Sequence, residues 1–171
     1  GDEIIVLQDI VLTETVTINA DKKVVLNLNG KTVTGTPTEA KAYAVITNKG
    51  NLTIKNGSIV CNHTLAGSTA YAVNTITNCG TLTIDGATIE NKSTATATAT
   101  NQIGYAIDNN STTGNAVVVV KSGAVRASGS YYYDGIRQFC NSEVKENSVT
   151  INGGKVSTLW MQNPSDGAEK N

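Results

Sequence analysis

The sequence is poor in aromatic residues and in charge. Its 171 residues include one Phe, one Trp, one Met and one His, and aromatic residues make up 5% of the chain. Charged residues make up 16%, against about a quarter in typical soluble domains, and the net charge is −1. Surfaces that bind nucleic acid or anionic membranes need an excess of positive charge. We therefore expect no nucleic-acid partner.

Cysteine and long apolar runs are also scarce. Cys61, Cys79 and Cys140 make an odd number and form no Cys-x-x-Cys pair, so the sequence predicts neither a zinc site nor a complete disulfide framework. We expect these cysteines to act as small hydrophobic residues near a core. No apolar run approaches the length of a membrane span, and we expect no membrane insertion.

Threonine and asparagine are abundant instead. The chain has 24 Thr and 19 Asn, which together make up about a quarter of it. Branched Thr suits the pleated surface of a sheet, whereas Asn suits turns because it tolerates positive φ and bonds its own backbone. This composition predicts an all-β protein with many short strands.

An eight-residue phrase occurs five times. The copies are LNLNGKTV at 26–33, LTIKNGSI at 52–59, LTIDGATI at 82–89, VVVKSGAV at 118–125 and VTINGGKV at 149–156. Each copy has aliphatic residues at its first, third and eighth positions, and the copies begin 26, 30, 36 and 31 residues apart. A repeat period between roughly 20 and 50 residues is typical of a solenoid or a repeat array.

A second repeated segment decides between two architectures for the phrase. Each phrase could form a β-hairpin around its tight turn, or one corner of a coil that returns as a parallel strand. The second segment reads Tyr43-Ala-Val-Ile46, Tyr71-Ala-Val-Asn74, Tyr105-Ala-Ile-Asp108 and Asp134-Gly-Ile-Arg137. A coil needs such a further strand in every repeat, and a hairpin array does not. The sequence therefore predicts a single-stranded parallel β-helix of about five to six coils, right-handed like most parallel crossovers.

Equal positions of the repeats should stack into columns. The two expected core columns are Leu26/Leu52/Leu82/Val118/Val149 and Val33/Ile59/Ile89/Val125/Val156. Between them, each phrase carries the Gly or Asn needed where the chain turns with positive φ. Asn48 and Asn78 each precede a phrase by four residues, and we expect them to form a ladder of amide hydrogen bonds from coil to coil.

The stacked phrases, with the opening segment IIVLQDIVLTETVTINADKKVVLNLNGKTVTG, resemble right-handed parallel β-helix domains of the pectate-lyase-like superfamily. The similarity runs from Ile4 to Val156 and is strongest to domains of secreted or cell-surface, adhesin-like bacterial proteins. It implies an extracellular or cell-surface location. We expect residues 1–171 to form one β-helix domain, a fragment of a longer surface protein. The last coil lacks a polar cap, so we expect either a continuing chain or end-to-end self-association to cover it.

The final positions of the second segment form a candidate binding row. They include Asn74, Asp108 and Arg137, and a looser alignment of residues 157–160 adds Trp160. In successive coils, these side chains should lie along one outer face. Amide, carboxylate, guanidinium and indole groups are those that grip a sugar chain. The alternative interpretation is an exposed Asp108–Arg137 ion pair beside an ordinary Trp, which would add little stability.

Enzymes of the pectate-lyase-like superfamily use clustered carboxylates, but this sequence matches none of their catalytic motifs. Asp108 is the only carboxylate expected in the row, and His63 has no partner at ligand spacing, so we assign no catalytic, metal or cofactor residue. An ice-binding face is disfavoured because Val119 interrupts the outward threonines. The expected function is a non-catalytic extracellular module that binds a polysaccharide or a host or cell-surface glycan. The alternative is a polysaccharide lyase or glycoside hydrolase.

Overall fold

The chain folds into β-strands throughout the part that can be described. The computed structural model describes residues 2–37, 41–65, 72–95, 104–112, 115–128, 133–139 and 147–162, and these contain no helix. Accordingly, no helix in these ranges is long and apolar enough to span a membrane. The strands are β1 (Asp2–Ile5), β2 (Ile10–Leu12), β3 (Val16–Ile18), β4 (Lys23–Asn27), β5 (Thr32–Gly35), β6 (Tyr43–Asn48), β7 (Asn51–Cys61), β8 (Thr64–Leu65), β9 (Val73–Asn78), β10 (Thr81–Asn91), β11 (Thr94–Ala95), β12 (Gly104–Asn109), β13 (Val117–Ala127), β14 (Tyr133–Phe139), β15 (Ser148–Ile151), β16 (Lys155–Val156) and β17 (Leu159–Gln162). The predicted all-β class is confirmed.

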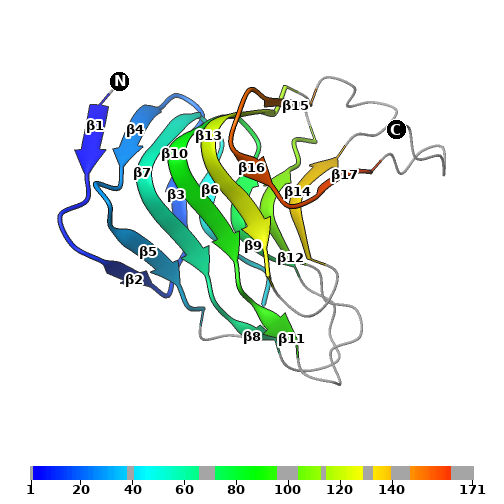
Figure 1. Cartoon of the computed structure of the whole chain (residues 1–171), viewed down its shortest axis with the longest axis horizontal. Helices are drawn as coiled ribbons and strands as arrows, with labels where there is room; N and C mark the ends of the chain where they lie inside the picture. The colour runs from blue at the N-terminus through cyan, green and yellow to red at the C-terminus, as the bar shows by residue number, and fades with distance from the viewer. Residues whose placement is uncertain are drawn as a thin grey trace.

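Two large parallel sheets contain nearly all of these strands. One has the order β1-β4-β7-β10-β13-β15, with β2, β5 and β16 paired alongside, and the other has the order β3-β6-β9-β12-β14-β17. The chain passes from one sheet to the other in every repeat, so that each repeat adds strands to both (Figure 1). All five phrases pair with their neighbours in parallel, so the hairpin alternative is wrong. The topology is consistent with the predicted parallel β-helix.

The hydrophobic core lies between the two large sheets and is built from aliphatic columns. Leu52, Leu82 and Val118 pair in register, and none is more than 1% exposed. The column Ile59–Ile89–Val125 is equally well aligned and fully buried. Burial of this kind contributes about 1.5–3 kcal/mol for each large aliphatic side chain. The predicted core columns are confirmed for these three repeats.

The start of the first phrase departs from the predicted register. Leu26 pairs with Ile54, and not with Leu52 as the phrase alignment predicts. The end of the phrase keeps its predicted register, so the first turn is two residues longer than the second. Asn29 and Gly30 both have positive φ, 51° and 75°, and allow this wider turn.

The predicted asparagine ladder is present and extends beyond the two residues named from the sequence. Asn48 Nδ2 donates to Asn78 Oδ1 at 2.7 Å, and Asn78 Nδ2 donates to Asn109 Oδ1 at 2.7 Å. Asn109 Nδ2 then donates to Gln138 Oε1 at 2.6 Å. All four side chains are buried, and the asparagines also donate to backbone carbonyls of their own coil and of the next coil. The ladder thus satisfies buried backbone groups where the chain passes between the sheets.

Candidate functional site

The outer face of the β3–β17 sheet carries one continuous row of side chains. A column of aliphatic residues, Ile46, Ile76, Ile107 and Ile136, packs into the core, and the residue after each one points to the opposite face. The row formed on that outer face is Thr17, Thr47, Thr77, Asp108, Arg137 and Trp160. Three threonines are thus followed by a carboxylate, a guanidinium and an indole on neighbouring strands.

The predicted position of Asn74 in this row is wrong. Asn74 pairs with Ala44 and lies three residues before Thr77, which occupies the row position next to Asp108. The prediction aligned the Tyr-Ala-aliphatic segments, but register follows the aliphatic column and the ladder amide two residues after it. That signal is visible as ITN at 46–48 and 76–78, IDN at 107–109 and IRQ at 136–138. The neighbouring placement of Asp108, Arg137 and Trp160 is confirmed.

Asp108 and Arg137 form a bidentate ion pair. Arg137 Nε donates to Asp108 Oδ1 and Arg137 Nη2 donates to Asp108 Oδ2, both at 2.7 Å. The side chain of Asp108 is 5% exposed and that of Arg137 is 15% exposed. The alternative interpretation of an exposed ion pair is therefore wrong about its exposure. Removal of one partner from a pair this buried would destabilise the fold, because the remaining charge would have little access to water.

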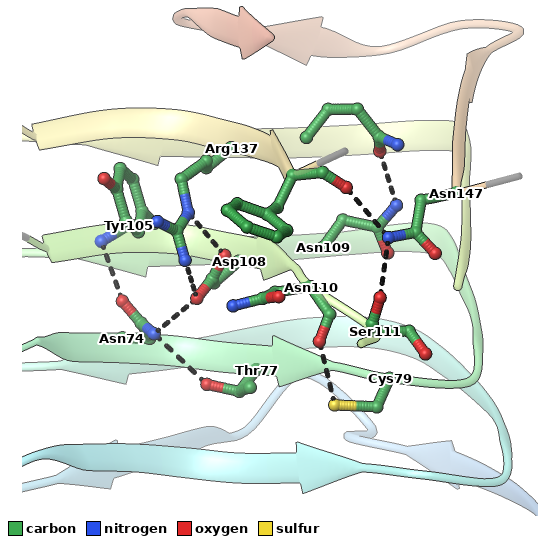
Figure 2. A network of polar contacts seen from close by, with 12 residues as sticks. Asn74, Thr77, Cys79, Tyr105, Asp108, Asn109, Asn110, Ser111, Arg137 and Asn147 are labelled. Carbon is green, nitrogen blue, oxygen red and sulfur yellow. Dashed lines mark hydrogen bonds and ion pairs between the residues drawn. The ribbon is translucent and has the colours of Figure 1, made fainter. Parts of the chain in front are cut away.

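Asn74 reaches this ion pair from outside the row. Its Nδ2 donates to Thr77 Oγ1 at 3.1 Å and to Asp108 Oδ2 at 3.4 Å, and its Oδ1 accepts from the backbone N–H of Tyr105 at 3.2 Å. Figure 2 shows that Asn74 and Arg137 both reach the Asp108 carboxylate. Asn74 itself is 4% exposed. Its amide therefore acts as a brace between β9 and β12, and it is not open to a ligand.

Two aromatic rings lie close to the guanidinium group of Arg137. Arg137 Cζ lies 4.7 Å from the centroid of the Tyr105 ring and 5.5 Å from that of Phe139. Both distances are within the range of cation–π attraction. The Tyr105 and Trp160 rings are 6.1 Å apart and inclined at 34°. Tyr105 is buried and Trp160 is partly exposed, so Trp160 is the member of this stack that a ligand could touch.

The surroundings of Tyr105 and Arg137 keep each side chain in one protonation state at neutral pH. Burial raises the pKa of Tyr105 to about 12, although the positive charge of Arg137 opposes this. Burial alone would lower the pKa of Arg137, but its hydrogen bonds with Asp108 and the Asp108 charge outweigh that effect and raise it. The phenol therefore stays neutral and the guanidinium stays charged at neutral pH. Neither group is suited to proton transfer there.

Metal binding finds no support among the residues that can be described. Within them, no three His, Cys, Asp or Glu side chains gather into a group that could hold a metal ion. His63 lies in the turn between β7 and β8, and burial lowers its pKa, although a backbone hydrogen bond with Pro37 opposes this. Cys140 and Tyr71, which were named from the sequence, lie outside the described ranges.

Comparison of the chain with protein-family models, with curated proteins and with solved structures found no match of any of the three kinds. The resemblance to pectate-lyase-like domains therefore rests on the repeated phrases and the opening segment of the sequence. The parallel sheets support the architecture, and the geometry around Trp160 is the basis for any inference about binding.

Proposed function

We propose that this chain is a non-catalytic, right-handed parallel β-helix module of a secreted or cell-surface bacterial protein, and that it binds a glycan through Trp160. The observation that carries this proposal is the stack in which the partly exposed Trp160 ring lies 6.1 Å from the buried Tyr105 ring. Tyr105 in turn packs against Arg137, which Asp108 holds in place. The indole thus rests on a support that exists before any ligand arrives.

This arrangement suits a sugar better than it suits an ion. An aromatic ring covers the apolar face of a pyranose, while polar side chains near it bond the hydroxyl groups. A ring that is already held in place loses little freedom on binding, which favours affinity. The charges of Asp108 and Arg137 compensate each other within one bidentate pair. A neutral glycan is therefore a better ligand than a phosphate or a polyanion.

The same ion pair argues for binding without catalysis. Inverting glycoside hydrolases need two carboxyl groups about 6.5–9.5 Å apart, one to donate a proton and one to activate water. The outer row offers one carboxylate, Asp108, and both of its oxygens accept hydrogen bonds from Arg137. Both oxygens of this carboxylate are therefore engaged by Arg137, and no second carboxylate in the row completes a catalytic pair. Polysaccharide lyase or hydrolase activity remains the alternative that an assay must test.

The test is a polysaccharide panel probed with the wild-type chain, Trp160→Ala and the control Met161→Ala. Met161 is the next residue on β17, is 48% exposed, and points to the other face of the strand. We expect Trp160→Ala to weaken binding by roughly tenfold or more, as loss of a central aromatic anchor does, and Met161→Ala to leave it nearly unchanged.

Two results would count against the proposal. Equal binding by Trp160→Ala and the wild-type chain would show that the indole does not contribute to glycan binding. Release of unsaturated products or new reducing ends, lost in Asp108→Asn, would show that the chain is an enzyme. Circular dichroism of each variant ensures that a loss of binding is not a loss of folding.

A further inference from the structure

The strand stack has two open ends within the described part of the chain. At one end β1, β2 and β3 each pair with a single strand, and at the other end the same holds for β15, β16 and β17. Among the described residues no strand pairs with the outer edges of these six strands, so another strand could add to their backbone N–H and C=O groups. Because the strands of all coils are parallel, the two ends are complementary in direction.

The core columns reach both ends with aliphatic residues. One column begins at Ile4 and ends at Ile151, and a second begins at Val16 and ends at Leu159. These four side chains are 52%, 45%, 40% and 42% exposed, respectively. A second stack placed on either end would continue both columns, aliphatic residue on aliphatic residue.

The charges of the two end coils differ in sign. The four charged residues in 2–18 are all acidic, namely Asp2, Glu3, Asp9 and Glu14. In 147–162 the only charged residue is Lys155. Contact between two first coils would bring the acidic groups together, whereas contact between a first and a last coil avoids this repulsion.

We propose that copies of this chain associate head to tail, with the β1–β3 coil of one copy stacked on the β15–β17 coil of the next. Such a contact joins two different surfaces and leaves one of each free, so larger assemblies grow with protein concentration. Asp2 restrains the association, because it is in register with Val24 and places a carboxylate at the end of an inward column. An inward-pointing charge on an edge strand is a common way to limit edge pairing.

The first test is sedimentation velocity of the full chain over a range of concentrations, with three variants. Ile151→Asp introduces a charge into the column end and should abolish association. Thr150→Asp makes the same change of charge at the neighbouring exposed position on the opposite face of β15, and it should associate like the wild-type chain. Asp2→Leu removes the restraint and should shift assembly to lower concentration.

A second test identifies the head-to-tail geometry. Ile4→Asp blocks the head and Ile151→Asp blocks the tail, so each variant alone should be monomeric. An equal mixture should give a dimer and nothing larger, because one intact head and one intact tail remain. Should Ile151→Asp not fold, Ile4→Asp can be compared with Val11→Asp, a 67% exposed position on the other face of the first coil.

Three results would overturn the proposal. The wild-type chain could remain monomeric at every concentration. Thr150→Asp could disrupt association as strongly as Ile151→Asp. The mixture of head-blocked and tail-blocked variants could fail to form a dimer.

Discussion

Asn78 lies in the middle of the ladder and makes four hydrogen bonds, so its replacement by Ala should be strongly destabilising. Its Oδ1 accepts from Asn48 at 2.7 Å, and its Nδ2 donates to Asn109 Oδ1 at 2.7 Å and to the backbone oxygens of Gly80 and Val117 at 2.9 and 3.1 Å. The side chain is fully buried. Ala would therefore remove bonds on both sides of one coil without giving water access to the groups left behind.

The expected magnitude follows from counting these bonds. An amide has two N–H groups and one oxygen, so three full hydrogen bonds are lost, each with a net contribution of about 1 kcal/mol. Asn109 Oδ1 also loses the donor in the Asn78 side chain, and a buried acceptor without a partner costs about 1 kcal/mol or more. The variant should lose about 4 kcal/mol of unfolding free energy. With a urea dependence of roughly 2 kcal/mol per M, the midpoint should fall by about 2 M.

Urea unfolding followed by far-UV circular dichroism measures this loss, and Asn110→Ala is the matched control. Asn110 lies next to the ladder; its side chain is half-buried and its buried side-chain oxygen accepts no hydrogen bond, so the same substitution there should cost less than about 1 kcal/mol. If both variants lose the same stability, the ladder bonds do not carry the effect. A loss below about 1 kcal/mol for Asn78→Ala would refute the count itself.

Three further predictions concern buried charge and a thiol. Arg137→Met should cost about 3–5 kcal/mol by leaving Asp108 unpaired, and the double variant Arg137→Met/Asp108→Leu should recover part of that loss in the same urea assay. Burial alone would raise the pKa of Glu90, but Arg126 outweighs it and holds this pKa below its usual 4.5. The interaction of ionised Glu90 with Arg126 therefore stabilises the fold fully above pH 4.5, and this stabilisation is lost as the pH falls through the lowered pKa. In a plot of melting temperature against pH, Glu90→Gln should therefore show a flatter acid branch than the wild-type chain. Burial raises the pKa of Cys61 to about 11, so mass spectrometry should find this thiol unmodified by iodoacetamide in the folded chain and modified in urea.

Much of the architecture could be predicted from sequence because the same local pattern recurs. A phrase with aliphatic residues at fixed positions and a Gly or Asn turn specifies the same bend each time it appears. Leu52, Leu82 and Val118 align as predicted, and Asn48 and Asn78 form the expected ladder. The predicted strand register is wrong at Leu26 and at Asn74, because the most similar sequence segments there are not the ones that pack side by side. In both places the register follows buried columns and ladder amides, which pair across repeats about thirty residues apart.

The sequence by itself determined that strands stack in parallel, that aliphatic columns fill the space between them, and that Asp108, Arg137 and Trp160 are neighbours. These properties depend on the repeat period and on the alternation of inward and outward residues, and both can be read directly from a repetitive sequence. Only the tertiary structure decided that the Asp108–Arg137 pair is buried, that Asn74 braces it from outside the row, and that Trp160 stays partly exposed while Tyr105 is buried. Alternation tells which face of a sheet a side chain occupies, but its exposure depends on groups brought to that face by distant parts of the chain.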